Sequence, residues 1–141
     1  MDKYTVILWF LTVCLWGMTP FIEKIGLKNV NPLQALFIRT FSALIGIFFA
    51  TFITSSFKFS SLNWKSISIL SLSGITGGFL GMLTYFTLLK AKEASQVVPL
   101  TSTYPLVTTI LAIVFLKEDL NFYKALGTLF IVIGIYLIFK S

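Results

Sequence analysis

Five long apolar segments alternate with short polar connections along the 141-residue chain. They cover approximately residues 4–27, 32–53, 66–89, 94–116 and 120–139. A bilayer-spanning helix needs about 20 mostly apolar residues, which is the length of these segments. The runs are unbroken and too long for the alternating strands of a membrane barrel. The pattern therefore predicts an all-α, polytopic membrane protein with five transmembrane helices in a single domain, residues 1–141.

The composition supports a membrane protein and argues against an enzyme. Apolar residues make up 57% of the chain and charged residues 11%, whereas a soluble domain carries about 25% charged residues. The chain has no histidine and one cysteine, Cys14, so we expect neither a metal site nor an intrachain disulfide. The pattern holds no Ser/His/Asp set, so we expect no catalytic residues, and nothing in it calls for a cofactor.

The net charge of +6 comes from lysines at the segment ends, which suit membrane lipid headgroups better than nucleic acid. With five spans, one side carries Lys3, Lys58, Lys65, Lys117 and Lys124, and the other carries Lys24, Lys28, Lys90, Lys92 and Lys140. Because Lys/Arg bias between loops sets orientation, this even division predicts dual topology. The alternative is that one or two residues still fix a single orientation.

The first segment carries polar and aromatic residues on one helical face. Trp9, Thr12, Trp16, Thr19 and Glu23 follow steps of three and four residues. Such a face is poorly suited to lipid, so we expect Trp16, Thr19 and Glu23 to line a partly hydrated cavity. The alternative is that Trp9 anchors the segment at the interface and that water solvates Glu23.

Arg39 is the single arginine and lies inside the second segment, after an N-cap expected at Asn31 and Pro32 at the first helical position. An ionisable residue within a span indicates a functional site unless its side chain reaches the headgroups. Glu23 has a similar expected depth, so we predict a Glu23–Arg39 pair, either structural or binding an anionic or zwitterionic substrate. Glu23 is also the candidate for proton coupling.

The third and fifth segments carry glycines at helix-packing spacing. In the third, Ser71, Gly74, Gly78, Gly81 and Tyr85 fall on one predicted face, with Tyr85 a candidate substrate contact. In the fifth, Gly127 and Gly134 are seven residues apart. Because small residues let helices approach closely, we expect Gly74, Gly78 and Gly81 to pack against a helix, and Gly127 and Gly134 to join subunits.

Prolines interrupt the first and fourth segments. Pro20 and Pro105 are predicted to kink their helices, and Pro105 leaves a carbonyl near Thr101 without its usual partner. Broken helices near the midplane often form transporter sites, so Thr101 and Tyr104 are candidate substrate contacts. The alternative is that the hydroxyls here bond back to their own helix.

The order of these features resembles an EamA-type domain of the drug/metabolite transporter superfamily. The matching pieces are Trp16-Gly17 with Phe21 and Lys24, Asn31-Pro32-Leu33 with Arg39, Tyr85-Phe86 with Leu88-Leu89-Lys90, Ala94-Ser95, Tyr104-Pro105, Leu116-Lys117-Glu118 and Gly127 with Ile133-Gly134. At Lys117 the family often has glycine instead.

The resemblance implies one five-helix repeat of a fold that usually contains two inverted repeats. It implies a secondary transporter that moves a small organic metabolite by alternating access, as an antiparallel homodimer in a prokaryotic plasma membrane. Protons are a further candidate ligand. The alternatives are a subunit that pairs with an oppositely oriented homologue, and a small channel or scaffold protein. Saturable flux and counterflow would separate a transporter from a channel.

Overall fold

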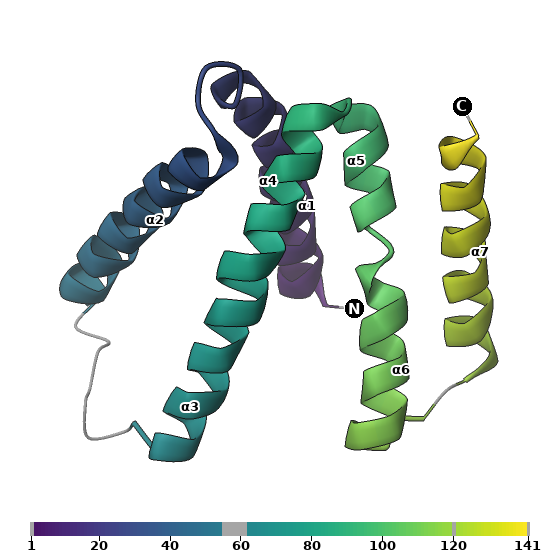
Figure 1. Cartoon of the computed structure of the whole chain (residues 1–141). Helices are drawn as coiled ribbons and strands as arrows, with labels where there is room; N and C mark the ends of the chain where they lie inside the picture. The colour runs from purple at the N-terminus through teal and green to yellow at the C-terminus, as the bar shows by residue number, and fades with distance from the viewer. Residues whose placement is uncertain (1, 55–61, 120, 141) are drawn as a thin grey trace. The chain divides into compact units, whose positions relative to one another are not determined.

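The computed structural model describes residues 2–54, 62–119 and 121–140 (Figure 1). All the regular elements in these ranges are helical. The chain divides into two compact units, residues 1–91 and residues 92–141, which are described separately below. Lys58, one of the lysines in the loop-charge count, lies outside the described residues.

Unit one contains three apolar helical segments. They are α1 (Lys3–Gly26), α2 (Pro32–Thr54) and a continuous run of α3 (Trp64–Ser73), η2 (Gly74–Gly81) and α4 (Met82–Ala91). A short turn joins α1 to α2 (Figure 1), and both α1 and α2 pack against α4. The helix α1 is continuous through Pro20, and the kink expected there stays a prediction.

The turn before α2 has the capping chemistry that the sequence predicts. The side chain of Asn31 accepts a hydrogen bond from the backbone N–H of Gln34 at 2.8 Å, and the side chain of Gln34 accepts from the N–H of Asn31 at 3.1 Å. This reciprocal capping box satisfies two otherwise unpaired donors, while Pro32 fits the first helical position. The start of α2 is thereby fixed close to the end of α1.

The middle of the third span is a π-helix, η2, which sequence reasoning did not predict. Its i→i+5 bonding widens the helical turn and interrupts α-helical spacing. The predicted single face of Ser71, Gly74, Gly78, Gly81 and Tyr85 assumed an unbroken α-helix, so that shared face is wrong across η2. A Cβ added at Gly74 or Gly78 would meet nothing within 4 Å. The expected packing of a helix against these glycines therefore stays a prediction.

Unit two contains α5 (Ala94–Thr101), α6 (Tyr104–Leu116) and α7 (Phe122–Phe139). The fourth span is broken at Ser102 and Thr103, because Pro105 lies in the first turn of α6 and supplies no N–H. The end of α6 is a left-handed residue, Lys117, at φ 55° and ψ 36°. The helices α5 and α7 contact each other.

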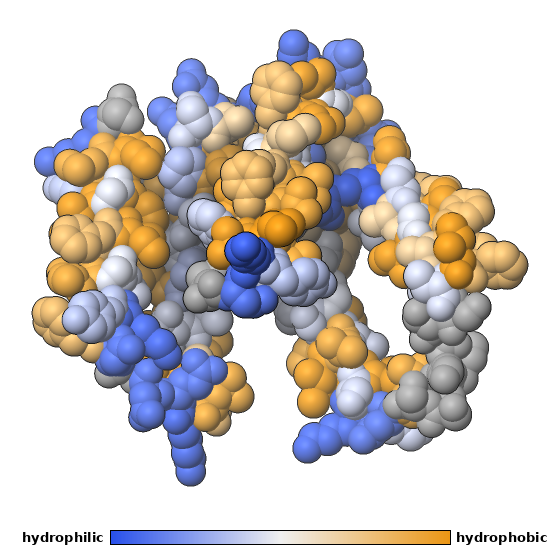
Figure 2. Space-filling view, turned by 180° about the vertical axis from the view of Figure 1, so that it is seen from behind, coloured by the Kyte–Doolittle hydropathy of each residue, from blue (hydrophilic) through white to orange (hydrophobic). Residues whose placement is uncertain are grey.

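The helices have the length and surface of membrane-spanning segments. Residues 3–26, 32–54, 64–91 and 94–116 are long and apolar enough to cross a membrane, and Phe122–Ile138 is a shorter apolar helix. Apolar side chains cover much of the helices on the face shown in Figure 2. The predicted all-α, polytopic membrane fold is confirmed over the described residues, and the observed helix limits lie close to the predicted ones.

Candidate functional site

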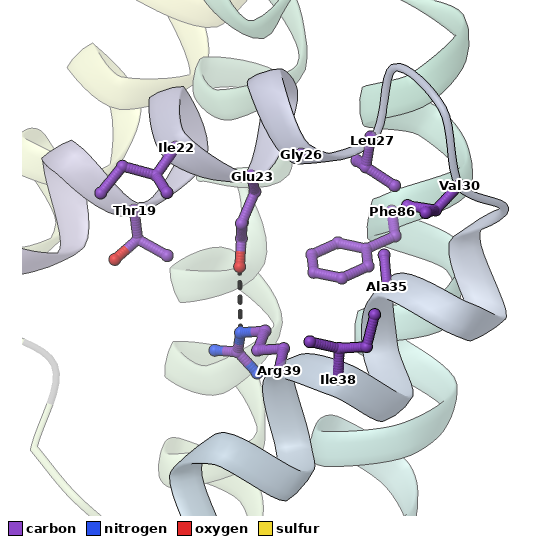
Figure 3. Close-up of a pocket in the computed structure, with 10 residues that line it drawn as sticks. All are labelled: Thr19, Ile22, Glu23, Gly26, Leu27, Val30, Ala35, Ile38, Arg39 and Phe86. Atoms are coloured by element: carbon purple, nitrogen blue, oxygen red, sulfur yellow. Dashed lines mark ion pairs between the residues drawn. The ribbon is translucent and has the colours of Figure 1, made fainter.

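A cavity of about 450 Å³ lies within unit one, between α1, α2 and α4 (Figure 3). Its size is within the range of small-molecule sites, about 300–1,000 Å³. The lining combines a few polar side chains with many apolar ones: Thr19, Ile22, Glu23, Gly26, Leu27, Val30, Ala35, Ile38, Arg39 and Phe86. The α1 residues Thr19, Ile22, Glu23 and Gly26 occupy positions i, i+3, i+4 and i+7, so they share one helix face.

A charged pair crosses this cavity. Arg39 Nε on α2 lies 2.9 Å from Glu23 Oε1 on α1, as the sequence predicts. The Glu23 side chain is 10% exposed and the Arg39 side chain 43% exposed. Although the two atoms are close, no described donor meets Oε1 with hydrogen-bond geometry, and Oε1 is buried. The contact is therefore an ion pair that leaves the carboxylate able to accept a further hydrogen bond or a proton.

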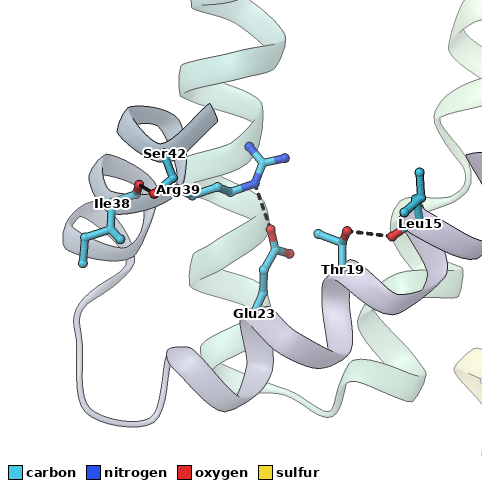
Figure 4. A network of polar contacts seen from close by, with 6 residues as sticks. All are labelled: Leu15, Thr19, Glu23, Ile38, Arg39 and Ser42. Atoms are coloured by element: carbon cyan, nitrogen blue, oxygen red, sulfur yellow. Dashed lines mark hydrogen bonds and ion pairs between the residues drawn. The ribbon is translucent and has the colours of Figure 1, made fainter. Parts of the chain in front are cut away.

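The nearby hydroxyl groups have partners on their own helices. Thr19 Oγ1 donates to the carbonyl of Leu15 at 2.8 Å, and Ser42 Oγ donates to the carbonyl of Ile38 at 2.9 Å (Figure 4). Such bonds back to the preceding turn are common for hydroxyl side chains within helices. Glu23 and Arg39 are therefore the groups that give this cavity its polar chemistry.

Two lysines bind backbone carbonyls near the α1–α2 turn. Lys24 Nζ donates to the carbonyl of Leu89 at 2.6 Å, and Lys90 Nζ donates to the carbonyl of Val30 at 2.6 Å. Both bonds join α4 to the segment around the turn, and Leu89 is fully buried. Carbonyls near a helix C-terminus lack intrahelical partners, and lysines there also complement the helix dipole. These bonds hold the α1–α2 turn to α4 beside the cavity.

The structure brings together Thr19, Glu23 and Arg39 among the predicted substrate contacts, since these three line the cavity. Trp16 is exposed and outside its lining. Tyr85 is also outside the lining, but it neighbours Phe86, with ring centroids 6.0 Å apart, and lies near enough to Glu23 and Arg39 to interact with both charges.

Two further predicted contacts, Thr101 and Tyr104, belong to unit two. Thr101 Oγ1 donates to the carbonyls of Val97 and Val98 at 2.9 and 3.1 Å, so its hydroxyl bonds back to its own helix. Tyr104 is exposed at the start of α6. Their contact with substrate stays a prediction.

Sequence reasoning missed the apolar part of the lining. Leu27, Val30 and Phe86 line the cavity, and Leu27 and Phe86 are among the most buried side chains. One signal was available: Ile38 and Arg39 follow Ala35 by three and four residues, so the three share the face of α2 that carries the charge. The partner residues on the turn and on α4 depend on tertiary packing, which the local spacing does not contain.

An all-helical membrane fold with a charged pair in a cavity between its helices is typical of membrane transport proteins. Residues 3–140 match the EamA-like transporter family, so the chain belongs to that family. The family and the names of its relatives indicate a multi-pass membrane transporter and not an enzyme family. No solved structure matches the chain.

The relatives fall into two length classes. An uncharacterized protein of Methanocaldococcus jannaschii is 32% identical over 134 residues, which cover 94% of each chain. An uncharacterized transporter of a Sinorhizobium species is 31% identical, with 91% of each chain covered. An uncharacterized transporter of Archaeoglobus fulgidus is 26% identical over 96% of this chain but 48% of its own length. The chain thus spans about half of some relatives and nearly all of others.

Proposed function

We propose that this chain is a secondary transporter that moves a small organic metabolite across a prokaryotic plasma membrane by alternating access. The observation that carries the proposal is the Glu23–Arg39 pair, which faces a cavity of small-molecule size between apolar helices. Charged groups inside a membrane are costly and mark substrate or ion pathways. A solely structural pair would not need a cavity beside it.

Alternating access requires contacts that one conformation makes and another breaks. The bonds from Lys24 to Leu89 and from Lys90 to Val30 are suitable, because they are side-chain hydrogen bonds that join two segments near the cavity. The binding of substrate at Glu23 and Arg39 would shift the balance between the two conformations through its different affinity for each.

We further propose that the functional unit is an antiparallel homodimer. Longer relatives contain roughly another chain length beyond the part matched here, and a second copy would supply an equivalent part. The even lysine division supports insertion in both orientations. A Cβ at Gly127 or Gly134 would meet nothing within 4 Å, which leaves room for a partner helix at these positions.

The test of transport uses the full chain in proteoliposomes given a defined mixture of small organic metabolites. We expect saturable accumulation of at least one compound, and counterflow when the vesicles are preloaded with it. Arg39→Ala should abolish that accumulation, because it removes the cavity's cation and leaves Glu23 without its counter-charge.

Lys28→Arg is the control, since it changes an exposed cationic side chain in the α1–α2 turn and keeps the Lys/Arg count of that side. The control should retain wild-type accumulation. Near-normal accumulation by Arg39→Ala would contradict a role for the pair in transport. Flux without saturation or counterflow would indicate a channel. Activity only after co-expression with an oppositely oriented homologue would indicate a hetero-oligomeric transporter.

A further inference from the structure

Most of the donors on the Arg39 guanidinium are directed away from Glu23. A guanidinium carries five N–H donors, and the atom of Arg39 in contact with Glu23 is Nε, which carries one of them. In Figure 4 the two terminal nitrogens point away from the Glu23 carboxylate. These nitrogens carry the remaining donors in the fork geometry that binds carboxylates in a bidentate manner. The site therefore presents a fork for an anion beside an ion pair that is already formed.

The rest of the lining is chemically suited to an apolar body. Ile22, Val30, Ile38 and Phe86 line the cavity with aliphatic and aromatic surface, and the Thr19 hydroxyl donates to its own helix. A ligand that fits this lining has one charged end, for Arg39, and an uncharged apolar remainder.

Charge balance within the membrane adds a second requirement. The ionised Glu23–Arg39 pair has no net charge, so a bound anion beside it would leave one uncompensated negative charge. Such a charge is costly in a low-dielectric environment. The cost is removed if a proton binds to Glu23, since Arg39 then compensates the ligand. The Glu23 carboxylate is the group that would take this proton, because its Oε1 is buried and has no hydrogen-bond partner among the described residues.

The other ionisable groups around Glu23 do not replace that proton. On α1, Lys24 donates to the Leu89 carbonyl, and on α4, Lys90 donates to the Val30 carbonyl. Tyr85 on α4 is uncharged when protonated and interacts electrostatically with both Glu23 and Arg39. Arg39 on α2 is the cation that contacts the carboxylate. Glu23 is the acid among these groups and therefore the place where a proton changes the balance.

We propose that the cavity binds a small organic acid together with one proton on Glu23, where the acid has an apolar body and one carboxylate. This proposal rests on the proposed transport function. The unequal exposure of the pair favours this class over a zwitterion. The Glu23 side chain is 10% exposed, so an ammonium group has little access to it, whereas a proton needs no space. Arg39, at 43% exposure, is open to a carboxylate.

The first test uses four probes that share a phenyl ring and differ in the charged end: phenylacetate, phenylacetamide, phenethylamine and the zwitterion phenylalanine. Thermal unfolding of the full chain is measured in micelles of a neutral detergent. We expect phenylacetate to stabilise the wild type most, and more in a mildly acidic buffer where it is still ionised. In Arg39→Gln, its affinity should fall about 10- to 100-fold, as for a lost charged hydrogen bond.

Lys28→Ala should bind phenylacetate as the wild type does, because Lys28 is exposed in the turn. Stronger stabilisation by phenethylamine, phenylalanine or the amide would overturn the assigned class, as would undiminished binding of phenylacetate to Arg39→Gln. Anionic phosphatidylglycerol is added in a separate arm. If it displaces phenylacetate from the site, a lipid headgroup is the ligand and the proposal is wrong.

The second test measures the uptake of protons from solution when phenylacetate binds. In weakly buffered micelles with a pH indicator, phenylacetate should be bound with uptake of up to one proton per site by the wild type. Glu23→Gln should bind the acid without proton uptake, because its amide is already neutral. Binding without uptake in the wild type would overturn the proposal. Since this assay needs no flux, acid binding without counterflow would contradict the transport function while leaving the ligand class intact.

Discussion

At the scale of single residues, the sequence predicted Thr19, Glu23 and Arg39 as part of the site. Glu23 and Arg39 are ionisable residues in otherwise apolar segments, and the segment lengths place both at a similar depth, so their 2.9 Å contact was predictable from local information. Phe86 and Leu27 could not be predicted in the same way, because apolar residues in a membrane protein face lipid, core or cavity with the same sequence pattern.

Lys117 adopts a left-handed backbone conformation that is unfavourable for a residue with a Cβ atom. It ends α6 in the left-handed region at φ 55°, where a side chain with a Cβ costs about 1–2 kcal/mol and glycine does not. We therefore expect Lys117→Gly to stabilise the folded chain by about 1 kcal/mol. Thermal unfolding in detergent measures this, with Lys117→Ala as the control that removes the charge but keeps the Cβ. Equal effects of the two substitutions would attribute any gain to charge.

At the scale of elements, the sequence predicted the extent of the helices better than their internal geometry. The start of α2 followed from the Asn31 cap and Pro32, and the break before α6 followed from Pro105, because each has a local cause. The π-helix η2 was not predicted, since its glycines suit close packing and a widened turn equally well.

The glycines of η2 give a test of that geometry. A Cβ at Gly81 would lie 3.2 Å from the carbonyl oxygen of Thr76, whereas a Cβ at Gly77 would meet nothing within 4 Å. Alanine is favoured over glycine in a helix by up to about 1 kcal/mol. We expect Gly77→Ala to raise the unfolding temperature of the monomer in detergent, and Gly81→Ala to raise it less or to lower it. Equal gains would contradict the widened turn.

At the scale of the whole molecule, the orientation depends on how Arg39 is counted. It lies within α2 and contacts Glu23, so it is a residue of the cavity and not of a loop. The loop count is then five lysines against five, which gives insertion little preference. Neither orientation nor assembly follows from the fold of one chain, because both depend on surfaces and lipids outside it.

Dual topology is tested with single cysteines at Asp2 or Ser141 in a Cys14→Ser background, because neither substitution removes a lysine from the loop count. A membrane-impermeant maleimide is applied to intact cells, and total reactivity is measured after lysis. If the chain inserts both ways, about half of each cysteine pool should be labelled from outside. Complete labelling of one terminus with full protection of the other would establish a single orientation and contradict the antiparallel homodimer.

The hydrogen bonds of Lys24 and Lys90 to backbone carbonyls should lower the reactivity of these two lysines toward acylating reagents. Lys24 and Lys90 each donate to a backbone carbonyl at 2.6 Å, whereas Lys28 is exposed in the turn between α1 and α2. An amine attacks an acylating reagent through its lone pair. An amine whose N–H groups donate to a backbone carbonyl is held in place and is less accessible to the reagent, so its acylation is slower. We expect a sulfonated succinimidyl ester to modify Lys28 first, as peptide mass spectrometry would show. Equal rates for the three lysines would contradict the hydrogen bonds. Faster modification of Lys24 and Lys90 during transport would show that the α1–α2 turn separates from α4, and it would do so without any introduced label.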